Sequence, residues 1–192
     1  MVETTIRGHV TIRDAMSDDA DAICRIYNEG IADRVATLET ELRTPAERRE
    51  WMAARGPRHP VLVAQTTPPA TVTDARGVVG DHADATASGL VTIGWASLNR
   101  FNPRPAYDHV ADVSVYVERA WRGRGVGRVL LAALIDRART LGYHKTVLAA
   151  FPDNAAGMAL SARLGFTRVG VYHEHGRLDG RWVDVVVMER LL

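Results

Sequence analysis

Hydrophobic residues recur along this chain with two different periods, which divide it into expected strands and helices. Apolar runs of the β type predict strands over 10–13, 60–64, 89–98, 109–117, 147–151, 166–172 and 183–188. Apolar positions three and four residues apart predict helices over 18–32, 45–56, 129–141 and 155–164. The resulting order, β-α-α-β-β-β-α-β-α-β-β, predicts a mixed sheet with helices on both faces.

Capping residues mark the boundaries of the expected helices. Ser17 is expected to cap the first helix. The stretch Thr44-Pro45-Ala46-Glu47 predicts a capping box with proline at the first helical position. Gly142 is expected to end the third helix, and Asn154 to cap the fourth.

The segment 66–88 departs from this pattern. It consists largely of Thr, Pro, Ala, Asp and Gly, so it cannot bury enough apolar surface to offset the entropy of ordering it. We predict a flexible insertion between two neighbouring strands, with a surface loop favoured over a functional lid. The whole chain, 1–192, including this insertion, is expected to form a single domain.

Composition narrows the class of protein. The chain is 46% apolar and 24% charged with a net charge of +1, so we expect no extended nucleic-acid interface. No apolar run approaches the roughly 18 residues of a membrane span, and no signal peptide is visible, which predicts a cytoplasmic protein without a membrane partner. The single cysteine, Cys24, lies in an apolar helical pattern and is expected to be a core thiol.

A glycine-rich turn separates the strand 109–117 from the helix 129–141. It reads Arg122-Gly123-Arg124-Gly125-Val126-Gly127. Glycines at every second position allow a tight turn, and the N-terminus of the following helix favours an anion. The Walker and dinucleotide-binding patterns are both absent. Taken alone, the turn predicts a phosphate cradle, with a basic surface turn or an RNA-binding Arg-Gly patch as alternatives.

Further motifs surround this turn, and their order is Ser114-Val115-Tyr116-Val117, the turn itself, Asn154 and Leu164-Gly165-Phe166. This arrangement resembles the GNAT superfamily of acetyl-CoA-dependent N-acetyltransferases. A narrower similarity, to the phosphinothricin and methionine sulfone/sulfoximine acetyltransferases, is carried by Ile26-Tyr27-Asn28, Arg104-Pro105-Ala106-Tyr107, Asp112-x-Ser114-x-Tyr116-Val117 and Gly180-Arg181-Trp182-Val183-Asp184-Val185. The resemblance covers 12–192 apart from the segment 66–88.

The resemblance implies a fold and a cosubstrate. The fold is the α/β (α+β) acyl-CoA N-acyltransferase fold, with a central mixed, mostly antiparallel sheet whose fourth and fifth strands splay apart to admit the cofactor. The cosubstrate is acetyl-CoA. Its pyrophosphate would be bound by Arg122, Gly123, Arg124, Gly125, Val126, Gly127 and Arg128, and its pantetheine arm by Val115, Tyr116, Val117 and Asn154.

Acetyl transfer requires a neutral amine, so a base must accept a proton. The resemblance places Asp112 where phosphinothricin acetyltransferases carry a glutamate that is thought to be the base, so the carboxylate is one methylene shorter here. His109 is the alternative base. The resemblance also places Ser161 in the catalytic site, where relatives carry a histidine or tyrosine. A serine is a poor acid at neutral pH, so Ser161 is expected at most to bind the cofactor sulfur or a water. Backbone N–H groups at a strand bulge near 115–117 are expected to stabilise the oxyanion.

The expected activity is N-acetylation of a small amino-acid-like amine, with direct transfer of the acetyl group. Contacts with this substrate are predicted for Arg104, Tyr107, Asp112, Val113 and Ser114. A non-catalytic acyl-CoA sensor and a protein N-acetyltransferase are the alternatives, and the natural acceptor is left open. The resemblance also implies a homodimer.

Two further groups of residues have a structural as well as a functional interpretation. His173-Glu174-His175 places two histidines on one face of a strand, but no third ligand is specified, so we expect a surface or pocket-lining role and no metal. Trp95 and Trp182 are expected to be core or interface aromatics.

Overall fold

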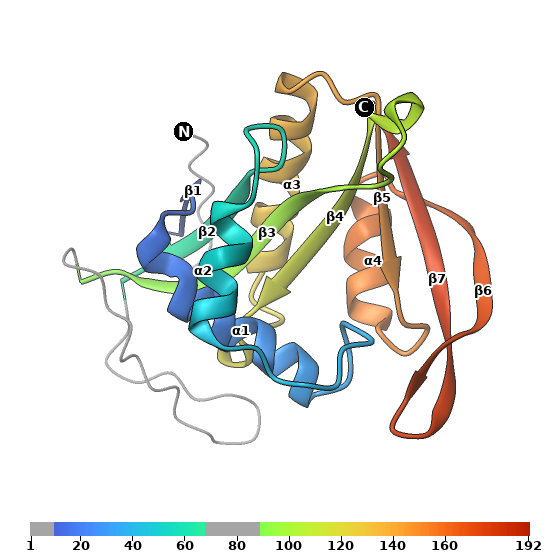
Figure 1. The fold of residues 1–192 in the computed structure, drawn as a ribbon, viewed down its shortest axis with the longest axis horizontal. Coiled ribbons are helices and arrows are strands. Elements are labelled where there is room, and N and C mark those ends of the chain that lie inside the picture. The colour runs from blue at the N-terminus through green and yellow to red at the C-terminus, as the bar shows by residue number, and fades with distance from the viewer. Residues whose placement is uncertain (1–9, 68–88) are drawn as a thin grey trace.

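The strands and helices occur in the order that the hydropathy pattern predicts (Figure 1). The computed structural model describes residues 10–67 and 89–192, so most of the predicted insertion 66–88 lies outside the described residues. The strands are β1 (Thr11–Asp14), β2 (Val61–Thr66), β3 (Val91–Arg100), β4 (Val110–Val117), β5 (Lys145–Ala150), β6 (Thr167–Leu178) and β7 (Arg181–Leu191). The helices are α1 (Ala20–Ala32), α2 (Pro45–Ala53), α3 (Val126–Thr140) and α4 (Ala155–Arg163). Short 3-10 turns occur at Ser17–Asp19, Pro105–Tyr107 and Arg119–Trp121.

A seven-stranded sheet in the order β1-β2-β3-β4-β5-β7-β6 forms the centre of the molecule. Its neighbouring strands are antiparallel except for β4 and β5, which are parallel. This parallel pairing ends at Asp112 opposite Val147, although β4 continues to Val117 and β5 to Ala150. The two strands diverge beyond that point, as Figure 1 shows, so the predicted splay is confirmed.

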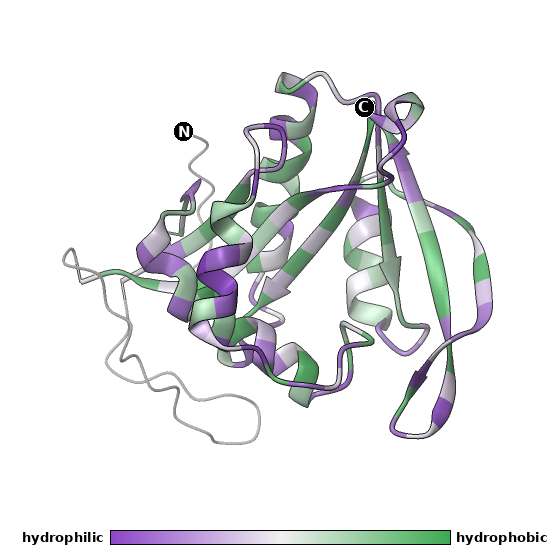
Figure 2. Ribbon diagram, viewed as in Figure 1, coloured by the Kyte–Doolittle hydropathy of each residue, from purple (hydrophilic) through white to green (hydrophobic). Residues whose placement is uncertain are grey.

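Helices cover both faces of the sheet. On one face α3 contributes Leu130 and Leu134 to the larger apolar cluster, and on the other α1 packs Ile23 and Ile26 against Trp95. In Figure 2 the central strands are mostly green or pale, whereas much of the α2 ribbon is purple. Burial of these apolar side chains is the main stabilising contribution to the fold.

Local sequence accounts for most helix boundaries. The backbone N–H of Glu47 donates to Thr44 Oγ1 at 3.2 Å, and the Glu47 carboxylate accepts from the Thr44 N–H at 2.7 Å, which is the predicted capping box. The prediction for Ser17 is wrong. The chain makes a 3-10 turn there, and it is the Asp19 carboxylate that accepts from the Met16 N–H at 2.7 Å.

Cys24 is buried, as predicted, and its thiol donates to the backbone carbonyl of Arg43 at 3.1 Å. None of the helices in 10–67 and 89–192 is long and apolar enough to cross a membrane.

Candidate active site

Two features of the candidate site adjoin β4, which diverges from β5: a glycine-rich turn and a cavity. The glycine-rich turn and the start of α3 follow directly after β4, and a cavity opens on the face of β3 and β4 that α1 and α2 cover. Asp112 lies at the last paired position before the strands separate.

The start of α3 has the geometry expected of the predicted cradle. Gly125 is the N-cap and has φ +88°, a left-handed conformation that favours glycine. In the described part of the chain, no acceptor contacts the N–H groups of Val126 and Gly127. At Gly127 a Cβ atom would lie 3.1 Å from Leu160 Cδ2 of α4, so glycine allows the two helices to pack closely. Free N–H groups at a helix start suit a phosphate oxygen.

The structure changes the expected role of the arginines in this turn. Arg122 pairs with Asp33 at 2.5 Å, and its Nε donates to the Val117 carbonyl at 3.1 Å. The charge of Arg122 is therefore largely compensated, and its ion pair with Asp33 connects the turn to the end of α1. The guanidinium of Arg124 lies 5.4 Å from the centroid of the Trp121 ring.

The edge of β4 that faces the gap suits an extended ligand. The Tyr116 carbonyl points toward Gly94 of β3, so by alternation the backbone groups of Val115 and Val117 face the side that β5 has left. The predicted bulge is not found, because the register between β3 and β4 is continuous from Gly94 to Arg100. Any oxyanion donor on β4 must therefore come from a regular strand edge.

Asn154 caps α4, as predicted: its Oδ1 accepts from the Gly157 N–H at 2.9 Å. None of the described residues accepts a hydrogen bond from its Nδ2, which is left as a donor. The cradle, the Asn154 amide and the β4 edge, apart from the Val117 carbonyl that Arg122 occupies, fit acetyl-CoA, which carries a pyrophosphate and an amide-containing arm.

A cavity of about 380 Å³ lies between the α1–α2 layer and the sheet. It is rich in aromatic and charged side chains and is lined by Tyr27, Glu39, Arg43, Glu47, Arg48, Trp51, Trp95, Ser97, Asn99, Ser114 and Tyr116. Its floor consists of alternate residues of β3 and β4, with Trp95 opposite Tyr116 and Ser97 opposite Ser114 in the register. Its size and mixed lining suit a small polar molecule.

Asp112 is joined to this cavity by a hydrogen-bond network. The Asn99 amide Nδ2 donates to Asp112 Oδ2 at 3.2 Å and to Ser114 Oγ at 3.0 Å. The Asn99 Oδ1 accepts from Ser97 Oγ and from Arg55 Nη2, each at 3.0 Å. Because these donors fix the orientation of the amide, Asn99 always presents its NH₂ group to Asp112.

Burial raises the pKa of Asp112 to about 6, and the hydrogen bond from Asn99 offsets only part of this effect. No ion pair with Asp112 occurs among residues 10–67 and 89–192. A carboxylate with a pKa near neutrality can accept a proton from an amine or a bridging water and release it again. These properties support its predicted role, although Asp112 itself lies behind Asn99 and Ser114 rather than in the cavity wall.

Ser161 is buried in α4, and its hydroxyl donates to the Gly157 carbonyl at 2.9 Å. The hydroxyl is thus already used within its own helix. His109 is exposed and precedes β4, as expected from its opposite strand parity.

Several other predicted residues lie outside the cavity wall. Arg104 and Tyr107 are exposed in the connection between β3 and β4, whereas Val113 is buried in the opposite, α3-facing core. Their predicted substrate contacts stay predictions. Trp95 is a core residue that also borders the cavity, whereas Trp182 is 61% exposed on β7 and is not a core residue.

The segment His173-Glu174-His175, where no metal was expected, lies in β6. His173 pairs with Asp184 at 3.0 Å, and no cluster of three potential metal ligands occurs within the described ranges.

The residues that surround Asp112 were not predicted from the sequence. The expected strand 89–98 included Ser97 but ended before Asn99, and the alternation of these two polar residues with Leu98 was the available signal. Their partnership with Ser114 and Asp112 depends on the register between β3 and β4, and the contact of Arg55 depends on the packing of the segment after α2.

Comparisons with known proteins agree with this geometry. Residues 48–166 match the model of the acetyltransferase (GNAT) family. An L-methionine sulfoximine/L-methionine sulfone acetyltransferase of Pseudomonas paraeruginosa is 34% identical over 180 residues, covering 93% of this chain and 92% of that protein.

Solved structures are similar over the same range. A GNAT superfamily phosphinothricin acetyltransferase from Sinorhizobium meliloti, in complex with acetyl-CoA, has a TM-score of 0.76 at 30% identity and covers 95% of this chain and 88% of that one. A ribosomal-protein-alanine N-acetyltransferase from Brucella melitensis has a TM-score of 0.79 at 31% identity, with 95% and 99% covered.

Proposed function

The chain belongs to the acetyltransferase (GNAT) family and is an acetyl-CoA-dependent N-acetyltransferase; on this premise, we propose that its acceptor is the amino group of a small amino-acid-like molecule of the methionine sulfone or phosphinothricin type. The observation that carries the proposal is the position of Asp112. It lies at the point where β4 and β5 separate, it has a pKa of about 6, and it is hydrogen-bonded to a wall of the small polar cavity.

Each part of the site then has a role in the reaction. When bound, acetyl-CoA supplies an activated acetyl thioester. The N–H groups at the start of α3 hold its pyrophosphate, and the free edge of β4 aligns its arm with the cavity. Asp112 accepts the proton of the acceptor ammonium through Ser114 or a bridging water, which leaves the amine neutral and nucleophilic. Asn99 orients the carboxylate.

Ser161 does not act as the acid in this scheme, because its hydroxyl is bonded to the Gly157 carbonyl. When the new C–N bond forms, the thioester C–S bond breaks, the nitrogen releases its second proton to solvent, and the leaving thiolate takes its proton from solvent. We further propose that the whole chain acts as a single catalytic domain in the cytoplasm and forms a homodimer.

A protein N-acetyltransferase is the second candidate, since one similar structure bears that name. A panel assay separates the two. Acetyl-CoA is incubated with methionine sulfone, methionine sulfoximine, phosphinothricin and standard amino acids, and in parallel with peptides that begin with alanine. Release of free thiol with the amino acids supports the proposal. Release with peptides alone favours the second candidate, and release with neither, despite acetyl-CoA binding, favours a sensor.

A further inference from the structure

Arg48 of α2 is a buried cation in the cavity wall. Only 7% of the residue is exposed, and its guanidinium carbon lies 4.3 Å from the ring centroid of Tyr27, 4.7 Å from that of Trp51 and 5.8 Å from that of Trp95. These aromatic faces stabilise the charge in part. They do not accept its N–H hydrogen bonds.

The guanidinium of Arg48 has no anionic partner among the residues that the structure describes. No hydrogen bond or ion pair links it to these residues, and its Nε is buried without an acceptor. A buried charge is costly unless it is paired, and each buried donor without a partner adds a further cost.

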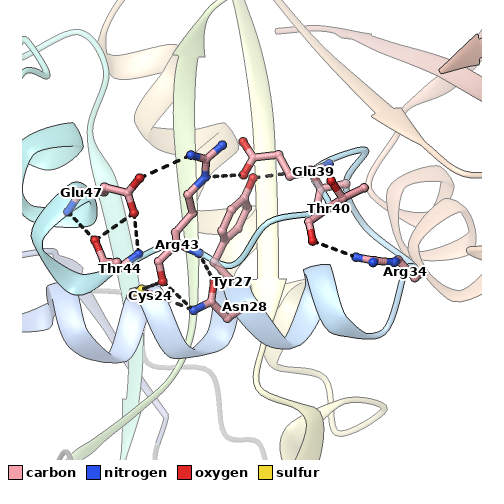
Figure 3. Close-up of polar contacts among 10 residues, drawn as sticks. Cys24, Tyr27, Asn28, Arg34, Glu39, Thr40, Arg43, Thr44 and Glu47 are labelled. Carbon is pink, nitrogen blue, oxygen red and sulfur yellow. Dashed lines mark hydrogen bonds and ion pairs between the residues drawn. The ribbon is translucent and has the colours of Figure 1, made fainter. Parts of the chain in front are cut away.

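The neighbouring cation in the same cavity differs sharply. Figure 3 shows Arg43 held between two carboxylates, with Glu39 at 2.7 Å and Glu47 at 3.5 Å. Both carboxylates therefore bond to Arg43, and neither bonds to Arg48.

A second donor in the cavity wall also lacks a partner. The indole Nε1 of Trp95 is buried without an acceptor, and Trp95 packs near the guanidinium of Arg48. A buried guanidinium without a carboxylate partner among the described residues, in the wall of a cavity, indicates that the cavity receives a ligand with anionic oxygens.

We propose that Arg48 binds the α-carboxylate of the acceptor. This inference rests on the proposed function and narrows it. The acceptor is a free α-amino acid, since its amine and carboxylate are attached to one carbon, and the amine then faces Ser114 and Asn99 in the same cavity. The N-terminal residue of a protein has no carboxylate beside its amine, so this subsite disfavours proteins as acceptors.

The planar guanidinium suits this ligand because its N–H groups can bind both carboxylate oxygens. The aromatic faces around it exclude water and hold the fork in one orientation, so the hydrogen bonds form in a site of low dielectric.

The test compares methionine sulfone with methionine sulfone carboxamide as acceptors. The sulfone side chain is uncharged, so the α-carboxylate is the only anion that Arg48 can bind. We expect the wild type to prefer the carboxylate by about 30-fold in kcat/KM, in line with the strength of charge-assisted hydrogen bonds. In Arg48→Met the preference should shrink by a similar factor, mainly through a higher KM for the carboxylate. Comparing the change in this ratio cancels the different amine basicities of the two acceptors.

Arg49→Met is the matched control. Arg49 is the next residue of α2, and its exposed guanidinium pairs with Asp21 on the surface at 2.6 Å. This variant should keep the wild-type ratio and turnover. Arg48→Lys retains the charge without the fork and should keep part of the preference, which provides a second variant in case Arg48→Met does not fold.

An unchanged ratio of the two acceptors in Arg48→Met would overturn the inference. Binding of methionine sulfone and its carboxamide is also measured by calorimetry in the presence of desulfo-CoA. Preferential binding of the carboxylate without turnover contradicts the proposed function but supports the anion subsite. Turnover with an unchanged ratio in Arg48→Met contradicts only the subsite.

Discussion

Asp112 illustrates how a single residue acquires chemistry from its surroundings. Its carboxylate accepts one hydrogen bond from Asn99, and burial keeps its pKa well above the ordinary value for an aspartate. Near neutral pH it exchanges a proton readily, whereas an exposed aspartate would stay ionised.

Replacing Asp112 with asparagine should reduce turnover by about 100-fold, the lower end of the usual contribution of a general base. Only the ionised carboxylate can accept a proton, so wild-type kcat/KM should rise with pH up to an apparent pKa of about 6 and then level off on the Asp112 limb. In Asp112→Asn this limb should be absent, while acetyl-CoA affinity stays within about twofold. Steady-state kinetics between pH 5 and 8 measure the turnover and the acidic limb. If Asp112→Asn kept the acidic limb of the wild type, Asp112 would not be the base in the mechanism.

Ser161 leads to the opposite expectation. Its hydroxyl bonds to the carbonyl of Gly157 inside α4, so its loss removes one local hydrogen bond and no proton donor. Ser161→Ala should keep kcat within about threefold of the wild type and change stability by about 1 kcal/mol or less. Stopped-assay kinetics and thermal unfolding measure these quantities. A decrease in kcat of about 100-fold with normal folding would show that the hydroxyl takes part in the reaction.

At the scale of elements, α2 is short and mostly polar, and it still positions Arg48 and Trp51 over the sheet. Its start depends on the capping box of Thr44 and Glu47. The helix therefore links local capping to the shape of the cavity.

Removing this cap should destabilise the protein measurably. Thr44→Ala is expected to cost about 1 kcal/mol, which corresponds to a decrease in Tm of about 2–4 °C for a chain of this size. Thr44→Ser retains the hydroxyl and serves as the control. Calorimetry measures the difference. Equal Tm values for Thr44→Ala and the wild type would mean that tertiary contacts alone fix the start of α2.

At the scale of the whole molecule, the loop after α1 contacts the β6–β7 hairpin. Arg34 pairs with Asp179 at 2.9 Å, and Leu38 packs so closely on Gly176 that a Cβ there would lie 2.5 Å from Leu38 Cδ1. The hairpin is therefore connected to the layer that carries the acceptor cavity.

The outer surface of this hairpin bears on the predicted homodimer. Tyr172 is 55% exposed and Trp182 is 61% exposed. If these residues lie in the dimer interface, Trp182→Glu should weaken association by about tenfold or more, because it places a charge in an apolar contact. Sedimentation equilibrium measures the dissociation constant of the dimer. Val169→Glu, which places the same charge at another exposed apolar position of the hairpin, on β6, serves as a comparison. A monomeric wild type would contradict the prediction.

The sequence by itself determined the order of elements, because the apolar period differs between strands and helices at every step of the chain. It also determined the caps at Thr44 and Asn154 and the glycine cradle, since these depend on a few consecutive residues. The likeness to the GNAT superfamily was readable for the same reason, as its motifs are short and local.

Only the tertiary structure decided which residues meet. The pairing of Asn99 with Asp112, the capture of Arg122 by Asp33 and the isolation of Arg48 among aromatic rings each join segments far apart in the chain. The regular β4 edge, where a bulge was expected, depends in the same way on its pairing with β3. Such contacts follow from strand register and helix packing, which depend on the balance of many weak interactions across the core and have no local signal in the sequence.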